Sequence, residues 1–392
     1  MAIRPRPVVS DSIAKRVALI VCKVTKVAPT RPVYLRAAAC PPAIVGGRSF
    51  SNCAAKMAFP TTTLGRDGPE ITALGYGAMG ISAFYEPHLT DEQAFPLFDK
   101  LIELGCTFWD TARIYGDNEE IIGRYFAKTS NRSKVFLCTK VGYKAPVVGG
   151  GIASPSGEPE FIRKSCEESL QRLGVETIDL YYQHRIDTTI PIEKTIAGFA
   201  ELVKEGKIRY IGLSECSAET LRRAYKVHPI AAVQIEYSPF SLDAETNGVI
   251  EACKELGVAV VAYSPLSRGF LTGAYSSPDD FEPNDVRRRL PRFQGENFPA
   301  NLELVNKLKT IAEKKGITTG QLSLAWLMAL GAIPIPGSTK ISRIEENVAS
   351  LNVKLTDEEL KTIREYVDAA NIVGGRYPPV VVNLYADTPA LE

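Results

Sequence analysis

The feature that most constrains the fold of this chain is a regular alternation of strand-like and helix-like segments after residue 57. Eight short apolar runs have the composition of buried strands, and amphipathic segments at helical spacing separate them. The predicted strands cover residues 71–77, 107–110, 135–141, 178–184, 209–214, 231–238, 258–264 and 332–338. The predicted helices cover residues 91–104, 118–128, 159–173, 192–205, 218–227, 244–256, 301–315, 342–350 and 356–370.

Eight buried strands that each return through a helix can form a closed barrel or an open doubly wound sheet. The count of eight favours an α/β fold of the (β/α)8 TIM-barrel type, with residues 57–392 as one domain. Polar residues support the barrel, because they recur at or near the carboxyl ends of the strands, where active sites of this fold lie. They are Asp110, Lys140, His184, Ser214, Gln234, Ser264 and Ser338.

The first 56 residues differ in charge from the rest. They hold ten Lys or Arg and one acid, Asp11, for a net charge of +9, whereas residues 57–392 carry −8. An Arg- and Ala-rich, Pro-interrupted leader is typical of a transit peptide, and GGRSFSNC (46–53) resembles a mitochondrial processing site. The alternative is a disordered extension upstream of a start at Met57. The first interpretation predicts a mitochondrial protein and the second a cytoplasmic one.

Charge and residue usage exclude several classes of partner. The acidic body argues against nucleic-acid binding, and the apolar run 17–24 is too short to span a bilayer. The eight cysteines form no CxxC pair and indicate reduced, mostly buried thiols. The three histidines are too dispersed for a typical zinc site, so we expect no metal.

The segment GYGAMG (75–80) matches the spacing of a dinucleotide-binding fingerprint, but the match is weak. That fingerprint needs a helix that opens at the third glycine, and ISAFYEPHLT follows here without helical periodicity. We interpret the segment as a glycine-rich strand end at which the backbone approaches another group closely.

Four residues at the predicted mouth of the barrel suggest proton transfer. Asp110 and Lys140 end neighbouring strands, and taken alone they are equally consistent with a structural ion pair. Tyr115 and His184 favour a role in proton transfer over a purely structural pair, since a cation near a phenol lowers the phenol pKa, which is ordinarily about 10. The set suits protonation of an oxygen on which charge develops. Carbonyl reduction also needs a hydride, which side chains do not carry, so a nicotinamide cofactor is implied.

Several motifs resemble those of the aldo-keto reductases from about residue 61 to 390. They are FWDTARIYGDNEEIIGR (108–124), CTKVG (138–142), SLQRLGVETIDLYYQHRID (169–187), IRYIGLSECS (208–217), VQIEYSPF (233–240), AYSPLSRGFLTG (262–273) and IPIPGSTKISRIEEN (333–347). The resemblance implies NADPH-dependent reduction of aldehydes and ketones without metal or flavin. It makes Tyr115 the general acid, Lys140 with Asp110 its tuner, and His184 the residue that orients the carbonyl.

The resemblance also implies a set of residues that hold NADPH/NADP+. Ser214 and Gln234 would contact the carboxamide, and Tyr263 would stack on the nicotinamide. Ser264 and Leu266 would lie on the pyrophosphate side. The residues around the 2′-phosphate would be Ser338, Lys340, Arg343 and Asn347, and the cofactor set also includes Gly77 and Met79 at the end of the first strand. Lys340 and Arg343 beside a helix start suit the extra phosphate of NADP, although an ordinary basic helix start has the same pattern.

Two positions depart from the pattern of many family members. Glu215 stands where many have Asn, which leaves its role at the carboxamide open, and Gly337 stands where many have Lys. This variant resembles the bacterial, fungal and plant branch with pyridoxal reductase-like and auxin-induced-like members.

Substrate specificity is expected in three loops, 147–159, 271–298 and 371–389. The second is long enough for a functional flap, and the third is placed to fold over the barrel mouth. Phe84, Tyr85 and Trp109 are candidate pocket aromatics, with core packing the alternative for Trp109.

The leading hypothesis is an NADPH-dependent reductase of small carbonyl compounds, with pyridoxal reductase activity as an alternative in the same class. A cofactor-binding sensor or accessory subunit with little turnover is an alternative from a different class, and a metal-dependent hydrolase is a third. The sequence leaves open whether the protein is a monomer or a homo-oligomer.

Overall fold

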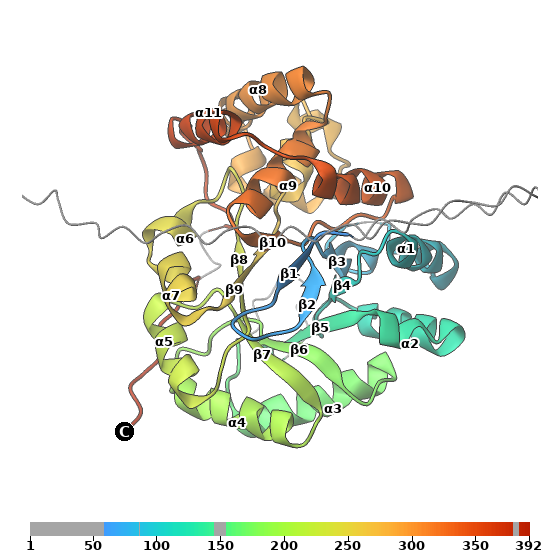
Figure 1. Ribbon diagram of the computed structural model, residues 1–392, viewed down its shortest axis with the longest axis vertical. Helices are drawn as coiled ribbons and strands as arrows, with labels where there is room; N and C mark the ends of the chain where they lie inside the picture. Colours follow the sequence, from blue (N-terminus) through green and yellow to red (C-terminus); the bar gives the residue numbers. More distant parts are fainter. Residues whose placement is uncertain (1–58, 86, 145–153, 379–383) are drawn as a thin grey trace, which may run out of the picture. The chain divides into compact units, whose positions relative to one another are not determined.

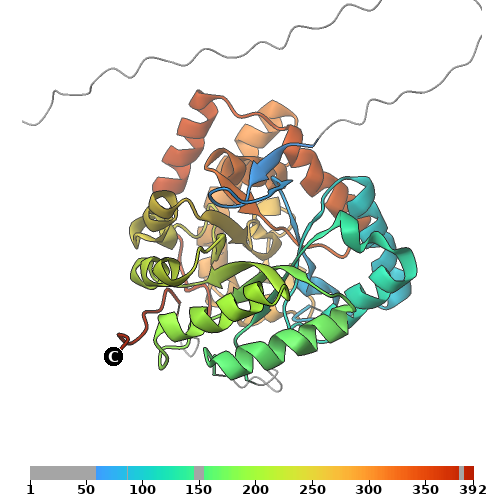
Figure 2. The same ribbon diagram turned by 60° about the horizontal axis from the view of Figure 1, so that its bottom comes forward.

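The computed structural model describes residues 59–85, 87–144, 154–378 and 384–392. Residues 1–56, and with them both interpretations of the leader, lie outside these ranges, as does most of the loop 147–159. In Figures 1 and 2 the strands of the described chain lie at the centre and helices surround them. No helix in the described ranges is both long and apolar enough to cross a membrane.

Eight parallel strands form the central sheet and are neighbours in the order in which they occur along the chain. They are β3 (Tyr76–Gly77), β4 (Phe108–Asp110), β5 (Phe136–Val141), β6 (Ile178–Gln183), β7 (Ile208–Ser214), β8 (Ala232–Glu236), β9 (Ala259–Tyr263) and β10 (Ala332–Pro334). Gly75 N donates to Pro334 O (2.9 Å) and Gly77 N to Pro336 O (3.3 Å), so the first strand meets the last and the sheet closes. The prediction of a (β/α)8 barrel is confirmed.

Two glycines allow this closure. A Cβ on Gly337 would lie 2.5 Å from Gly77 O, and a Cβ on Gly77 would lie 2.8 Å from Ile335 O. The close approach predicted for GYGAMG is therefore made to the chain's own backbone. A short 3-10 helix, η1 (Ala78–Ile81), follows β3, and the first α-helix in the described part of the chain begins at Asp91, so the segment is not a dinucleotide fingerprint.

The helices pack around the barrel through apolar faces at helical spacing. In α4 (Ile192–Lys204), for example, Ile192, Ile196, Phe199 and Leu202 are buried. The others are α1 (Asp91–Glu103), α2 (Asn118–Thr129), α3 (Pro159–Leu173), α5 (Ala218–Val227), α6 (Asp243–Thr246), α7 (Val249–Leu256), α8 (Asn297–Lys315), α9 (Thr319–Ala329), α10 (Ile341–Ala349) and α11 (Asp357–Asp368).

Three element predictions were wrong. The strand at 71–77 is two strands, because Glu70–Thr72 belongs to a separate hairpin. The helix at 244–256 is α6 and α7, divided at Gly248, whose φ of 85° ends helical geometry. The helix α9 was missed, since most of its residues are buried and it shows no alternation of polar and apolar faces.

A two-stranded hairpin closes the amino end of the barrel. It consists of β1 (Thr61–Thr63) and β2 (Glu70–Thr72), and Figures 1 and 2 show it across one end of the strands. Leu64 and Ile71 of this hairpin pack with Phe108 and Leu180 inside the barrel. The carboxyl ends of the strands therefore form the end available for a site.

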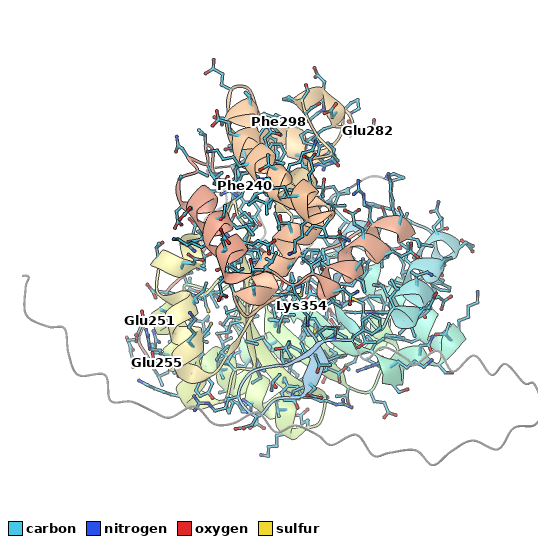
Figure 3. All side chains as sticks on the ribbon, turned by 45° about the horizontal axis from the view of Figure 1, so that its top comes forward. Phe240, Glu251, Glu255, Glu282, Phe298 and Lys354 are labelled. Carbon is cyan, nitrogen blue, oxygen red and sulfur yellow. The ribbon has the colours of Figure 1, made fainter. Side chains whose placement is uncertain are left out.

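The long segment 271–298 is anchored at its base by aromatic packing. The ring of Phe298 lies 4.8 Å from Phe270 and 6.0 Å from Phe281, measured between centroids. Figure 3 labels Phe298 and Phe240, and the Phe240 ring lies 5.5 Å from the Phe270 ring. Arg287 lies over the rings of Tyr275 (4.6 Å) and Phe281 (4.4 Å). These contacts fix much of the segment that was predicted to be a flap.

Candidate active site

Asp110 and Lys140 meet at the carboxyl ends of β4 and β5. Lys140 Nζ donates to Asp110 Oδ1 and to Thr111 O (2.9 Å), and Gln234 Nε2 donates to Asp110 Oδ2 (2.8 Å). Lys140 is fully buried. Burial alone would lower the pKa of Lys140, but the Asp110 carboxylate and the Tyr115 hydroxyl raise it above its usual value. The cation is thus held beside Tyr115 by a carboxylate and a carbonyl.

Tyr115 reaches the same place from the loop between β4 and α2. Its backbone N donates to Ala112 O (3.0 Å), which closes a turn, and Ser82 Oγ donates to Tyr115 O (2.7 Å). Lys140 Nζ lies 5.2 Å from the centre of the Tyr115 ring. The five-residue step from Asp110 therefore returns the phenol to the ion pair.

The pKa of Tyr115 differs from the sequence expectation. Burial raises this pKa above its usual value, while Lys140 and Arg185 act to lower it and Asp110 adds to the rise. Lys140 acts on the Tyr115 pKa in the expected direction, but the prediction that this pKa is lowered overall was wrong. Desolvation of the phenol outweighs the effect of Lys140, because only 8% of the residue is exposed.

His184 directly follows β6 and faces Tyr115 edge-on. The two ring centroids lie 5.9 Å apart at an interplanar angle of 87°, and the Tyr143 ring lies 5.5 Å from His184 on another side. Burial, together with Lys140 and Arg185, lowers the pKa of His184 well below its usual value, so the imidazole is neutral. Its Nδ1 has no hydrogen-bond partner among the described residues. A neutral ring with unused polar capacity can accept or donate a hydrogen bond to a ligand.

The residues predicted for the carboxamide and the nicotinamide ring lie around this set. Ser214 ends β7, and its Oγ accepts from Arg185 Nη1 (3.3 Å). Gln234 is bonded to Asp110 instead of facing outward. The hydroxyl of Tyr263, at the end of β9, donates to Glu215 Oε1 (2.8 Å).

The residues predicted for the phosphates lie on two loops and at the start of α10. Ser264 has a positive φ of 47°, and Leu266 packs against the core. Lys340 precedes α10, and its N donates to Ser338 Oγ (3.1 Å). Arg343 pairs with Glu346 (2.6 Å), one turn along the helix.

The remaining predicted cofactor residues are more buried. Asn347 is 8% exposed on the inner side of α10. Gly77 ends β3, and Met79 packs against the small cluster of Ala83, Ala112 and Tyr115. The structure thus brings Met79 to the same cluster as Tyr115.

Comparison with known proteins assigns the family. The aldo/keto reductase family model matches residues 73–368. The chain belongs to this family. The aldo-keto reductase str7 of Strobilurus tenacellus is 49% identical over 329 residues, which are 82% of this chain and 95% of that protein. The aldo-keto reductase yakc [NADP(+)] of Schizosaccharomyces pombe is 49% identical over 342 residues, 86% of this chain and 99% of that protein.

Solved structures agree with this assignment. The thermostable aldo-keto reductase Tm1743, in complex with the inhibitor epalrestat, has a TM-score of 0.64 at 31% identity, covering 78% of this chain and 99% of its own. The glycerol dehydrogenase AKR11B4 from Gluconobacter oxydans has a TM-score of 0.72 at 27% identity, and the match covers 82% of this chain and 98% of that chain.

Among the candidate pocket aromatics of this aldo-keto reductase, Trp109 lies in the core, which was the second of its two interpretations. Its side chain is fully buried, stacks on Phe98 (5.0 Å between centroids) and donates from Nε1 to Cys106 O (2.8 Å). Successive residues of a strand point to opposite faces, so Trp109 points to the helices when Asp110 points inward. Phe84 lies 6.4 Å from the Tyr115 ring, and Tyr85 lies under Arg287 at 5.8 Å.

Several residues at the mouth of the reductase were not predicted. Arg185 contacts Ser214 and the His184 carbonyl (2.8 Å), and the Arg268 guanidinium lies 5.5 Å from the Tyr377 ring centre. Arg376 pairs with Glu215. For Arg185 its place directly after the histidine was a usable signal, whereas nothing local in the sequence links Arg376 to Glu215.

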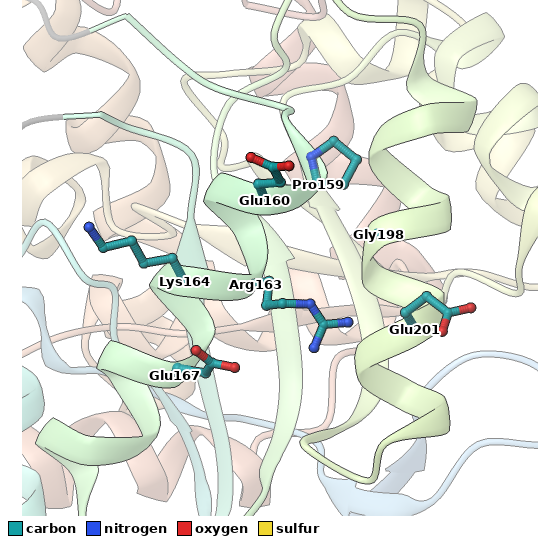
Figure 4. A pocket seen from close by; sticks show the side chains of 7 residues that line it. All are labelled: Pro159, Glu160, Arg163, Lys164, Glu167, Gly198 and Glu201. Atoms are coloured by element: carbon teal, nitrogen blue, oxygen red, sulfur yellow. The ribbon is translucent and has the colours of Figure 1, made fainter.

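A groove of about 260 Å³ lies between α3 and α4, away from these residues (Figure 4). Charged side chains line it, including Glu160, Arg163, Lys164, Glu167 and Glu201. Arg163 is paired with Glu205 (2.6 Å), so its charge is already compensated. We assign no role in the reaction to this groove.

Proposed function

We propose that the protein reduces small aldehydes and ketones with NADPH, and that Tyr115 donates the proton. Family membership and the 49% identity to a relative whose name carries NADP(+) support the cofactor. The observation that carries the proposed mechanism is the position of Lys140, between the carboxylate of Asp110 and the ring of Tyr115. An ion pair that served only to join two strands would not need a phenol beside the ammonium.

The side chains at the mouth fit NADPH in kind. His184 Nδ1, which has no hydrogen-bond partner among the described residues, marks a polar position that a ligand can fill. Ser214 and Gln234 carry donors and acceptors for a carboxamide, and Tyr263 offers a ring face to nicotinamide. Lys340 and Arg343 would hold the 2′-phosphate, and cations suit that group. When bound, NADPH supplies the hydride for the carbonyl carbon.

The chain's own residues account for the proton. Tyr115 Oη carries a proton at neutral pH because burial raises its pKa, so it can protonate the carbonyl oxygen of the substrate. Lys140 opposes this rise and stabilises the phenolate that remains. Asp110 keeps Lys140 charged although the ammonium is buried. Neutral His184 orients the carbonyl oxygen from the other side of Tyr115.

Loss of absorbance at 340 nm tests the proposal. We expect the wild type to oxidise NADPH with 4-nitrobenzaldehyde, methylglyoxal or pyridoxal, and the Tyr115→Phe variant to lose at least about 100-fold in kcat, the usual contribution of a general acid. Tyr225→Phe on α5 is the matched control and should keep wild-type turnover. Equal turnover by Tyr115→Phe and wild type would exclude Tyr115 as the donor. Wild-type protein without activity on any carbonyl would exclude the function.

A further inference from the structure

Glu215 occupies an unusual position at the mouth of the barrel. It follows β7 directly, it is fully buried, and its φ of 52° is positive for a residue with a side chain. Its backbone N donates to Gln234 O (3.1 Å). A buried carboxylate requires partners, since desolvation of an unpaired charge is costly. Its partners therefore show what the residue does.

Both oxygens of the Glu215 carboxylate accept hydrogen bonds from other parts of the protein. Oε1 accepts from Glu236 N (3.0 Å), from Tyr263 Oη (2.8 Å) and from Arg376 Nη1 (3.2 Å). Oε2 accepts from Arg376 Nη2 (3.2 Å). A carboxylate offers about four acceptor positions, and the Glu215 side chain is fully buried among these partners, so it is not accessible to an amide of the cofactor. Glu215 instead joins β9 to the C-terminal tail.

The tail contacts the same group of residues twice more. Tyr377 Oη lies 3.2 Å from Tyr263 Oη. Farther along the tail, Ala386 N donates to Glu215 O (3.2 Å). Arg376 also lies near Glu236 (3.8 Å) and Asp243 (3.5 Å), and only 7% of its side chain is exposed. Tyr263 is therefore held at its hydroxyl by Glu215 on one side and by Tyr377 on the other.

We propose that Arg376 is a positioning residue for the nicotinamide, acting through Glu215 and Tyr263. The proposal rests on the proposed function, in which the Tyr263 ring carries the nicotinamide. The bidentate Arg376–Glu215 pair fixes the carboxylate, which fixes the Tyr263 hydroxyl, and it places Tyr377 against the same hydroxyl. The C-terminal tail is thereby part of the cofactor site, and Glu215 takes no direct part in binding the carboxamide.

The test compares Arg376→Gln with Arg223→Gln. Arg223 also holds the tail, through Thr388 O (2.9 Å) and Pro389 O (2.6 Å), and pairs with Glu193 (2.7 Å), but it does not touch Glu215. We expect Arg376→Gln to raise the NADPH dissociation constant, measured by quenching of protein fluorescence, about tenfold. Arg223→Gln should change it less than about twofold. With 4-deuterated NADPH, the isotope effect on kcat should rise in Arg376→Gln alone.

A double variant separates positioning from stability. Arg376→Gln leaves Glu215 buried without a cation, so its melting temperature should fall. In Glu215→Gln/Arg376→Gln no isolated charge remains, and the melting temperature should recover while the weaker NADPH binding persists. Recovery of both the melting temperature and the NADPH affinity would show a purely structural pair and would overturn the inference. Equal effects of Arg376→Gln and Arg223→Gln on NADPH binding, or wild-type affinity in Arg376→Gln, would overturn it as well. Wild-type protein that binds no NADPH would overturn the proposed function as well.

Discussion

Lys140 lies where a lone ammonium would be unstable, because its side chain is fully buried in the interior of the barrel. Asp110, Thr111 and Gln234 supply or complete its hydrogen bonds. Removal of one partner from a buried ion pair costs about 3–5 kcal/mol, because the other charge is left buried and unpaired. A buried ion pair is therefore weak evidence for stability alone, and a role in function is a better explanation for it. In the proposed mechanism the nearby Tyr115 provides such a role, because the ammonium would stabilise charge that develops on the phenol oxygen.

The pKa shifts of Tyr115 and His184 predict how reduction depends on pH. Burial raises the tyrosine pKa above its ordinary value of about 10 and lowers the histidine pKa well below its ordinary value of about 6.5. The proposed mechanism requires protonated Tyr115 and neutral His184, and neither group should titrate between about pH 7 and 9. We expect kcat/KM for a carbonyl substrate to be flat over this interval and to fall as pH rises through the tyrosine pKa. A half-maximal point near neutral pH would contradict this assignment.

At the scale of elements, the loop between β4 and α2 is held by buried side chains that carry no chemistry. Asn118, the first residue of α2, donates from Nδ2 to Ala78 O (2.9 Å) and Ser82 Oγ (3.1 Å). Its Oδ1 accepts from Thr111 Oγ1 (2.7 Å). Ser82 in turn donates to Tyr115 O. The position of the tyrosine thus depends on contacts between this loop and η1.

Asn118→Ala should reduce both stability and activity. The variant leaves Ala78 O and two buried hydroxyls short of partners, at a cost of about 1–3 kcal/mol for each unsatisfied group. Tyr115 then loses its fixed distance from Lys140, and kcat should fall by more than the unfolded fraction explains. Urea unfolding and initial rates on the same preparations measure both effects. Asn131→Ala, which removes one partly buried bond to Tyr125 (3.0 Å), is the control. A variant with lower stability but wild-type kcat would refute the role of the loop.

The sequence predicted helices well where apolar residues recur at helical spacing, and strands well where a short apolar run is buried on both faces. The strands β4, β5 and β6, at whose carboxyl ends Asp110, Lys140 and His184 lie, fall close to their predicted bounds. The helix α9 failed this criterion because residues on almost every side of it are buried. For Trp109 the sequence left a pocket position and core packing open. The pleat favours core packing, because it sends the side chains of adjacent strand residues to opposite faces and Asp110 points inward.

At the scale of the whole molecule, tertiary pairing limited what the sequence could show. Arg376 and Glu215 are 161 residues apart, and Gln234 reaches Asp110 across 124 residues. No local pattern encodes such pairs, since they exist only once the barrel and the tail are folded. Residues that match a family motif were predictable one by one. Their partners were not, and the expected fall in the Tyr115 pKa was wrong because burial depends on those partners.

The β1–β2 hairpin should contribute to the stability of the barrel. The hairpin begins at Thr61, and its Leu64 and Ile71 are 0% and 5% exposed against the barrel interior. A chain that starts at Met57 keeps these contacts and should keep the melting temperature of the full chain. A chain that starts at Ala73 loses both side chains, each worth roughly 1.5–3 kcal/mol on burial, and uncovers Phe108 and Leu180.

Point variants separate this effect from truncation itself. Leu64→Ala in the full chain should cost about 2–5 kcal/mol in the free energy of unfolding, because it opens a cavity at the end of the barrel. Leu330→Ala, at a position that is 41% exposed, should change the free energy of unfolding by less than about 0.5 kcal/mol. Equal effects of the two leucine variants in urea unfolding would show that the hairpin does not seal the barrel. The amino end would then need another source of closure than Leu64 and Ile71.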